Sequence, residues 1–162
     1  MADPEIGKTY ALKFVDVDGN TQSTADGRTT TVLVLTNKAG FSKARMVGER
    51  VPDRCLANPA YRMITVVKFA KHSAPVQKFF TVMARGRLDK EAAILQERYA
   101  ARKIEKDARR DVFAVTDFGG VIASQLQSEQ SVFRVFVFGR KGELLRRWDD
   151  VPTTEQLAEV LK

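Results

Sequence analysis

The sequence predicts a single α/β domain over residues 1–162, in which helices cover both faces of a mainly parallel sheet. Two observations predict this class. Strand-like and helical segments alternate along the chain with short connections. In addition, Thr30 to Leu35 is an unbroken run of β-branched and aliphatic residues, which is typical of a central strand with both faces buried. No internal repeat, low-complexity tract or linker divides the chain.

The first half of the chain predicts a hairpin followed by a strand, a helix and a second strand. Asp18-Gly19-Asn20 suits a tight turn, because glycine and asparagine tolerate positive φ. The expected elements are a strand over 10–17, turns at 18–20 and 26–27, a strand over 30–35, a helix from Phe41 to about Val51, and a strand over 62–69.

The second half predicts a long helical segment over about 76–110, with Ser73 as its N-cap and Pro75 in its first turn. Gly86 is a point at which this helix could divide, because glycine costs up to about 1 kcal/mol in a helix interior. Thr153 and Gln156 have capping-box spacing and begin a closing helix that turns Leu157, Val160 and Leu161 inward. The other expected elements are strands over 111–116, 131–138 and 143–148, a short helix from 118–120 through Leu126, and a hairpin loop at 139–142.

Composition excludes several kinds of site. The 162 residues include one cysteine, Cys55, and one histidine, His72, so an intramolecular disulfide, a redox cysteine pair and a cysteine-rich zinc site are all impossible. We expect no metal site and no cofactor. No segment approaches the roughly 20 consecutive apolar residues that cross a bilayer, and no secretory signal is visible. The expected location is the cytoplasm, and the alternative is an exported chain whose Met1 replaces a removed leader.

Two segments carry a family resemblance. Leu12-Lys-Phe-Val-Asp-Val-Asp18-Gly19 is similar to an F-x-L-x-D-x-D-G hairpin, and residues 136–148 followed by 154–161 look like a closing hairpin and helix. Together with the order of elements, they resemble the thioredoxin-like superfamily, in its peroxiredoxin and thiol–disulfide oxidoreductase branch. The resemblance implies a three-layer α/β/α sandwich with an N-terminal β-hairpin and a long helical segment before the third core strand.

The chain departs from this family where the redox chemistry would stand. Ala39 and Ser42 occupy the expected cysteine positions, Phe133 stands in place of the cis-proline, and no peroxiredoxin P-x-x-x-T-x-x-C loop exists. The chemistry needs a thiolate at a helix N-terminus, where the helix dipole lowers the thiol pKa. The resemblance therefore implies the fold without the redox activity.

The first functional hypothesis is a redox-inactive binding or scaffold domain for a protein partner, with no catalytic residues. In redox-active relatives the corresponding surface receives extended protein substrates. The residues expected to form it here are Lys38, Ala39, Gly40, Phe41, Ser42 and Phe133. The sequence leaves the partner and the oligomeric state open.

A divergent thiol oxidoreductase or peroxidase that uses Cys55 is the first alternative. Arg54 would lower the pKa of this thiol. However, Cys55 is expected near the C-terminal end of the first helix, where the dipole disfavours a thiolate. A lone cysteine is more often a small buried hydrophobe, so the structural interpretation is favoured.

Electrostatic nucleic-acid binding is the second alternative, since the net charge is +7. Acidic residues are mixed among the basic ones, and no aromatic-plus-basic RNA motif is present, so this hypothesis ranks lower. The basic surface would consist of Arg98, Arg102, Lys103, Lys106, Arg109 and Arg110.

Three weaker patterns have simpler explanations. His72 beside Ser73 lacks a positioned partner for catalysis, so we expect a surface-loop histidine. Asp16, Asp18 and Asn20 lack the glycine and glutamate of a calcium loop, which favours a hairpin turn. The segment 139–142 matches no phosphate-binding loop and is expected to be a basic hairpin tip.

Overall fold

The computed structural model describes residues 3–162 and contains one five-stranded sheet with strand order β5-β4-β3-β6-β7. Its strands are β3 (Thr30–Thr36), β4 (Tyr61–Phe69), β5 (Phe113–Phe118), β6 (Phe133–Phe138) and β7 (Leu144–Trp148). The first three strands are parallel, whereas β6 and β7 run antiparallel to their neighbours. β1 (Lys13–Val15) and β2 (Thr21–Ser23) form a separate antiparallel hairpin, shorter than the strand predicted over 10–17.

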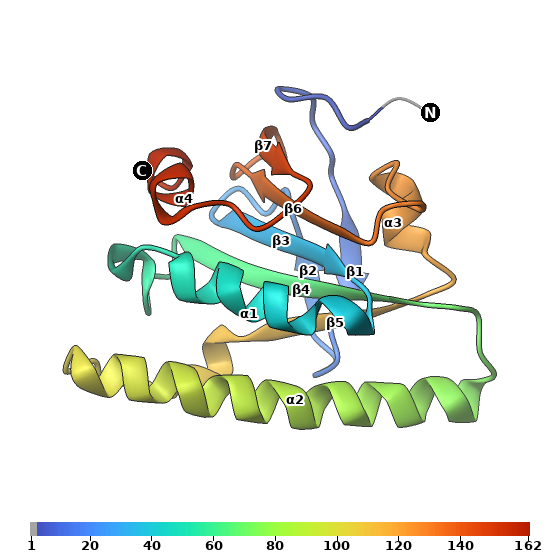
Figure 1. The fold of residues 1–162 in the computed structure, drawn as a ribbon, viewed down its shortest axis with the longest axis horizontal. Coiled ribbons are helices and arrows are strands. Elements are labelled where there is room, and N and C mark those ends of the chain that lie inside the picture. The colour runs from blue at the N-terminus through green and yellow to red at the C-terminus, as the bar shows by residue number, and fades with distance from the viewer. Residues whose placement is uncertain (1–2) are drawn as a thin grey trace.

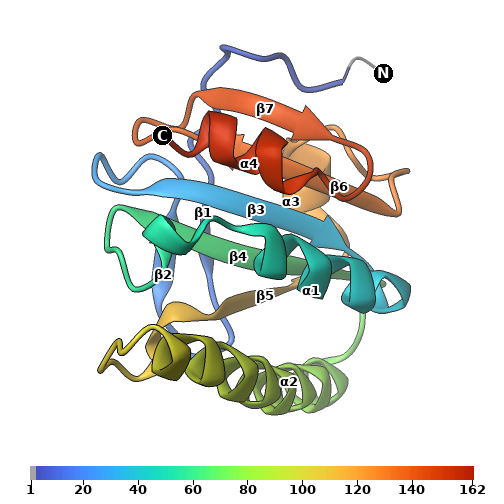
Figure 2. The same ribbon diagram turned by 60° about the vertical axis from the view of Figure 1, so that its left-hand side comes forward.

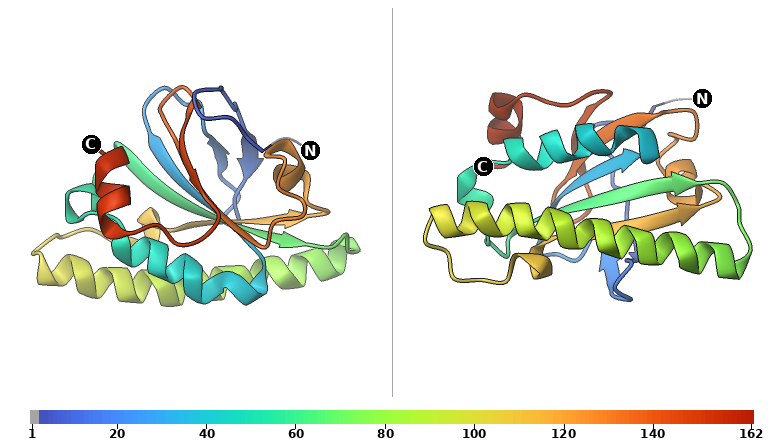
Figure 3. Two further views of the ribbon diagram at one scale, coloured as in Figure 1. Left: turned by 45° about the horizontal axis from the view of Figure 1, so that its top comes forward. Right: turned by 60° about the horizontal axis from the view of Figure 1, so that its bottom comes forward.

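Helices and the hairpin cover both faces of the sheet, so the predicted three-layer α/β architecture is confirmed (Figures 1 and 3). α1, α2 and α4 lie on one face, and α3 lies with the β1–β2 hairpin on the other. The helices are α1 (Phe41–Arg50), α2 (Ala74–Ala101), α3 (Val121–Gln125) and α4 (Thr154–Val160), with 3-10 turns η1 (Lys38–Gly40), η2 (Asp53–Cys55) and η3 (Ala108–Asp111). Within the described residues, no helix is both long and apolar enough to span a membrane.

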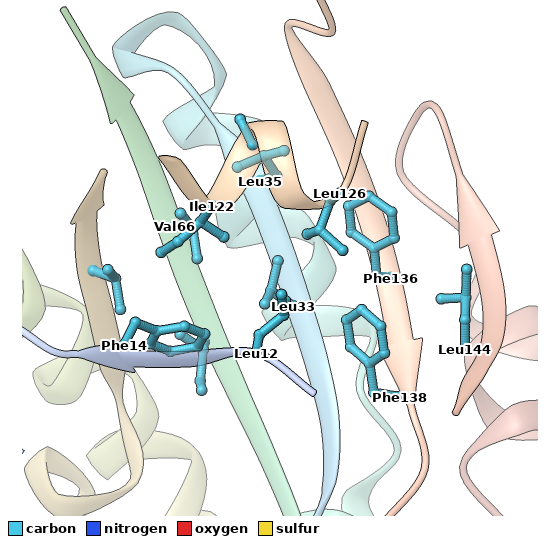
Figure 4. Packing of buried hydrophobic residues seen from close by; sticks show 13 residues of the cluster. Leu12, Phe14, Leu33, Leu35, Val66, Ile122, Leu126, Phe136, Phe138 and Leu144 are labelled. Atoms are coloured by element: carbon cyan, nitrogen blue, oxygen red, sulfur yellow. The ribbon is translucent and has the colours of Figure 1, made fainter. Parts of the chain in front are cut away.

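The central strand β3 sends alternate side chains into two cores, because successive residues of a strand point to opposite faces. On the hairpin side, Leu33 and Leu35 pack with Leu12 and Phe14 of the hairpin and with Ile122 of α3 (Figure 4). On the helical side, Val32 and Val34 pack with α1 and α4 through Ala44, Val47, Leu157 and Leu161. The prediction that both faces of this strand are buried is confirmed.

α1 ends before it reaches Cys55, which the sequence placed near the C-terminal end of this helix. The helix stops at Arg50, and Val51 is extended because Pro52 follows it. Cys55 lies five residues farther on, in the separate turn η2. The expectation that Cys55 sits at the end of the first helix is therefore wrong.

α2 begins and ends differently from the predicted 76–110 helix. It is continuous through Gly86, which faces open space, so the suggested division is wrong. It ends at Ala101 because Lys103 adopts the left-handed conformation (φ 57°), and the amide of Ile104 donates to the carbonyl of Tyr99. This Schellman closure normally uses glycine, and no glycine stands at this position to predict it.

The N-cap of α2 and the first residues of β5 and β6 also differ from the prediction. Ser73 holds the N-cap position of α2, but its side chain makes no capping hydrogen bond. β5 begins at Phe113 instead of Asp111, because residues 108–111 form η3, and β6 begins at Phe133 instead of Ser131. The capping box of Thr153 and Gln156 is present as predicted.

Candidate functional site

The carboxyl ends of the three parallel strands meet at one edge of the sheet, where polypeptide loops leave toward α1, α2 and α3 (Figure 2). In open α/β sheets, ligands bind at this end of the strands. We call this region the strand-end surface. It consists of residues 38–42 together with Phe69, Lys71, His72, Phe80, Phe118 and Phe133.

The segment 38–42 connects β3 to α1. The side chain of Asn37 accepts a hydrogen bond of 3.0 Å from the amide of Ala39 and so starts η1. Ala39 and Ser42 are both exposed, and Ser42 is the second residue of α1. The two residues that the resemblance places at the cysteine positions therefore lie at the N-terminal end of this helix.

Gly40 joins this segment to β6. It is buried, and a Cβ atom there would collide with Oγ1 of Thr36 and lie 3.3 Å from the ring of Phe133. Phe133 opens β6 directly opposite Thr36. The predicted residues are thus brought together, but Gly40 and Phe133 are buried, so the expectation that they form part of an exposed binding surface is wrong. No cis peptide bond occurs at Phe133 or elsewhere in residues 3–162.

An aromatic cluster extends the strand-end surface in a way that the sequence did not reveal. The rings of Phe69 and Phe80 stack with centroids 4.9 Å apart, and Phe69 also stacks on Phe118 at 5.2 Å. The ammonium group of Lys38 lies 4.2 Å from the centroid of Phe80, within cation–π range. These residues come from four separate elements, so only the topology reveals their proximity.

His72 lies in the loop between β4 and α2, as predicted, and its ring also contacts this cluster. Its half-buried ring lies 5.3 Å from Phe80 and 6.2 Å from Phe118. The neighbouring Ser73 is exposed. The aromatic packing explains the position of His72 without a catalytic role.

Several lysines lie on or beside the strand-end surface. Lys43 pairs with Asp150 at 3.1 Å and lies over the ring of Phe133. Lys68 donates to the carbonyl of Ser131, and burial lowers the pKa of its ammonium group. Lys68 and Lys71 line an open depression together with Gly119, Gly120 and Glu129. The chemistry of this surface therefore combines aromatic faces with positive charge.

Cys55 lies away from the strand-end surface. It is buried in the core beneath α1 and α4, and burial raises the pKa of its thiol more than Arg54 lowers it. The guanidinium group of Arg54 donates instead to the carbonyls of Ala158 and Leu161, where it caps α4. The environment of Cys55 therefore disfavours a thiolate.

Four members of the predicted basic surface are engaged in intramolecular ion pairs. Arg98 and Arg102 both bind Asp53, and Lys106 binds Asp111 at 2.8 Å. Arg109 binds Asp18 at 2.8 Å and Asp89 at 2.9 Å. Lys103 and Arg110 are exposed. Most of these cations fasten the end of α2 to the rest of the fold.

The two remaining patterns are stabilised turns. The carboxylate of Asp16 is buried and accepts hydrogen bonds from the amides of Asp18 and Asn20. In the loop 139–142, the carboxylate of Glu143 accepts from the amide of Lys141. Among residues 3–162, no group of three potential metal ligands converges.

Comparison with known proteins adds evidence on the fold. No family model and no curated protein sequence matches the chain. Solved structures do match over nearly the whole chain. A candidate protein disulfide isomerase from Bacteroides thetaiotaomicron has a TM-score of 0.60 and 10% identity, covering 99% of this chain and 91% of its own. The exposed lipoprotein thioredoxin Etrx1 from Streptococcus pneumoniae has a TM-score of 0.55 and 13% identity, with coverage of 93% and 97%.

A third similar structure is a secreted thiol-disulfide isomerase from Corynebacterium glutamicum. Its TM-score is 0.53 and its identity is 8%, and the match covers 94% of this chain and 82% of that one. Since all three identities are below 15%, the likeness establishes the fold and leaves the activity open.

Proposed function

We propose that this chain, which has the thioredoxin-like fold, is a binding or scaffold domain without redox chemistry of its own. The strand-end surface would hold an extended segment of a protein partner. The observation that carries this proposal is the pair Ala39 and Ser42, which lies exposed at the N-terminus of α1, where relatives of this fold hold their redox cysteines.

Two features of the strand-end surface support a binding role. Aromatic rings and the stem of Lys38 offer apolar contact area, which protein interfaces use for anchoring residues. Lys38 and Lys71 favour a partner segment that carries acidic side chains. We therefore expect an extended polypeptide with aromatic or aliphatic residues next to carboxylates.

The two alternatives have weaker support. The oxidoreductase hypothesis depends on Cys55, whose burial and raised pKa oppose nucleophilic reactivity. The nucleic-acid hypothesis depends on cations of which Arg98, Arg102, Lys106 and Arg109 already have carboxylate partners.

Site-specific photo-crosslinking in the source cell tests the proposal. A benzophenone amino acid at Ser42 should capture a defined protein partner, and the added substitution Lys38→Glu should abolish the adduct. The matched control places the same crosslinker at Lys141, an exposed residue of the β6–β7 loop, and should give no such adduct. An adduct that survives Lys38→Glu, or that forms equally at Lys141, contradicts the proposal.

A redox assay tests the second half of the proposal. The wild-type protein should not accelerate insulin reduction by dithiothreitol, and Cys55→Ser should behave identically. Acceleration by the wild type that disappears in Cys55→Ser would establish the oxidoreductase alternative instead.

The exported alternative for cellular location gains support from two similar structures. One is described as an exposed lipoprotein and another as secreted. Fractionation of the source cell decides between this location and the cytoplasm.

A further inference from the structure

A cavity of about 260 Å³ lies between α1, α2 and the sheet, on the face opposite the β1–β2 hairpin. It adjoins the strand-end surface at Phe41, which lines both. Its floor is formed by the alternate residues Met63, Thr65 and Val67 of β4, and its walls include Leu88 and Leu95 of α2. Most of these side chains are apolar.

Small residues on both helices create this space. α1 presents Ala44 and Gly48 to the cavity, and α2 presents Ala84. Met63 lies beneath Gly48, where a Cβ atom would be 3.7 Å from its sulfur. Because these positions carry little side-chain volume, the two helices do not fill the space between them. An apolar cavity of about 150 Å³ stays free of water and binds benzene, so a cavity of this size has room for a larger apolar group.

Long arginine side chains bridge the two helices at the rim. Arg45 of α1 pairs with Glu91 of α2 at 2.8 Å. The guanidinium group of Arg87 lies 4.1 Å from the ring centroid of Phe41. Within residues 3–162, no carboxylate lies within ion-pair distance of Arg87. A planar guanidinium group binds a carboxylate through two parallel hydrogen bonds, so Arg87 is suited to an anionic head group at the cavity mouth.

From this arrangement we propose that the cavity binds a medium-chain alkyl carboxylate, with its chain among the apolar residues and its carboxylate at Arg87. The apolar lining would hold the alkyl chain. The guanidinium group of Arg87, which has no ion-pair partner among residues 3–162, would bind the carboxylate although Glu49 and Glu91 also line the cavity. The proposal is independent of the function assigned to the strand-end surface.

Methionine methyl resonances give a direct test in the intact protein. Met63 lines the cavity, whereas Met46 and Met83 are exposed on the outer sides of α1 and α2 and serve as internal controls. Titration with decanoate below its micelle concentration should shift the Met63 methyl resonance saturably and leave Met46 and Met83 unchanged. No Met63 shift, or a shift of Met83 without Met63, overturns the proposal.

Chain length and head group provide further tests. Affinity should rise about fourfold per added methylene from octanoate to decanoate, as expected for burial of one methylene. Decanol should bind at least about tenfold more weakly than decanoate, and Arg87→Ala should reduce that difference. Equal binding of decanol and decanoate to the wild type would overturn the assignment of the carboxylate to Arg87.

Filling the cavity should prevent binding. Ala84→Phe should abolish the Met63 shift. If this variant does not fold, the smaller change Ala84→Leu serves instead and should weaken binding. The control Val82→Phe places the same ring on the exposed side of α2 and should leave binding intact. Decanoate binding that survives both Ala84 variants in folded protein contradicts the proposed site.

Discussion

The hydroxyl of Tyr99 donates a hydrogen bond of 2.6 Å to Oδ2 of Asp111, twelve residues later in the chain. The same oxygen of Tyr99 accepts from the amide of Ala57 at 3.2 Å. The ring is 1% exposed. One buried side chain thus joins the end of α2, the segment after η2 and the approach to β5.

Replacement of this tyrosine should destabilise the protein. Tyr99→Phe keeps the ring but leaves the Ala57 amide and the Asp111 carboxylate without the hydroxyl, which should lower the free energy of unfolding by about 1–3 kcal/mol. Urea denaturation followed by circular dichroism measures the change. A midpoint equal to that of the wild type would show that the hydroxyl contributes nothing.

The same residue should make stability depend on alkaline pH. Burial, followed by the hydrogen bond to Asp111, raises the pKa of Tyr99 above its ordinary value near 10. Because the folded state holds the proton more tightly, this stabilisation is complete below pH 10 and is lost as pH rises through the folded-state pKa. Wild type should therefore lose more stability than Tyr99→Phe between about pH 9 and pH 11. Parallel stability curves for the two proteins would disprove the linkage.

Gly40 should tolerate no side chain. In Gly40→Ala the new methyl group would press against Thr36 and Phe133, and such overpacking costs about 1–3 kcal/mol. Thermal unfolding measures the loss. Gly86→Ala is the matched control, since Gly86 faces open space in α2 and alanine is the better helix former, so its melting temperature should stay the same or rise. A Gly40→Ala melting curve that overlays the wild type contradicts the predicted clash.

The Cys55 thiol should react slowly in the folded protein. Burial excludes reagent, and the raised pKa reduces the thiolate fraction at neutral pH. Iodoacetamide at pH 7.5 should alkylate the native protein at least about tenfold more slowly than the urea-unfolded chain. Mass spectrometry follows the reaction, and equal rates in the two states would show that the thiol is accessible.

Much of the sheet is predictable because its strands carry strong local patterns. The run from Thr30 to Leu35 revealed a strand buried on both faces, and the capping box at Thr153 revealed the start of α4. The end of α2 was missed because the residue that adopts positive φ there is Lys103, and lysine has no preference for this conformation.

The candidate site was only partly predictable for a different reason. The segment 38–42 could be located because it follows the central strand directly. Lys38, Phe69, Phe80 and Phe118 come together only through the parallel arrangement of β3, β4 and β5, which fixes their strand ends at one edge. The cavity left no signal in the sequence, because it depends on the distance between two helices.

The arginine bridges between α1 and α2 have a consequence for how the protein responds to its medium. Arg45 and Glu91 are both partly exposed, so dissolved ions screen their attraction, with a Debye length of about 8 Å at physiological ionic strength. The opposite face of the sheet is held by aliphatic and aromatic packing that salt does not screen. The spacing of α1 and α2, and with it the access to the cavity between them, should therefore change with ionic strength.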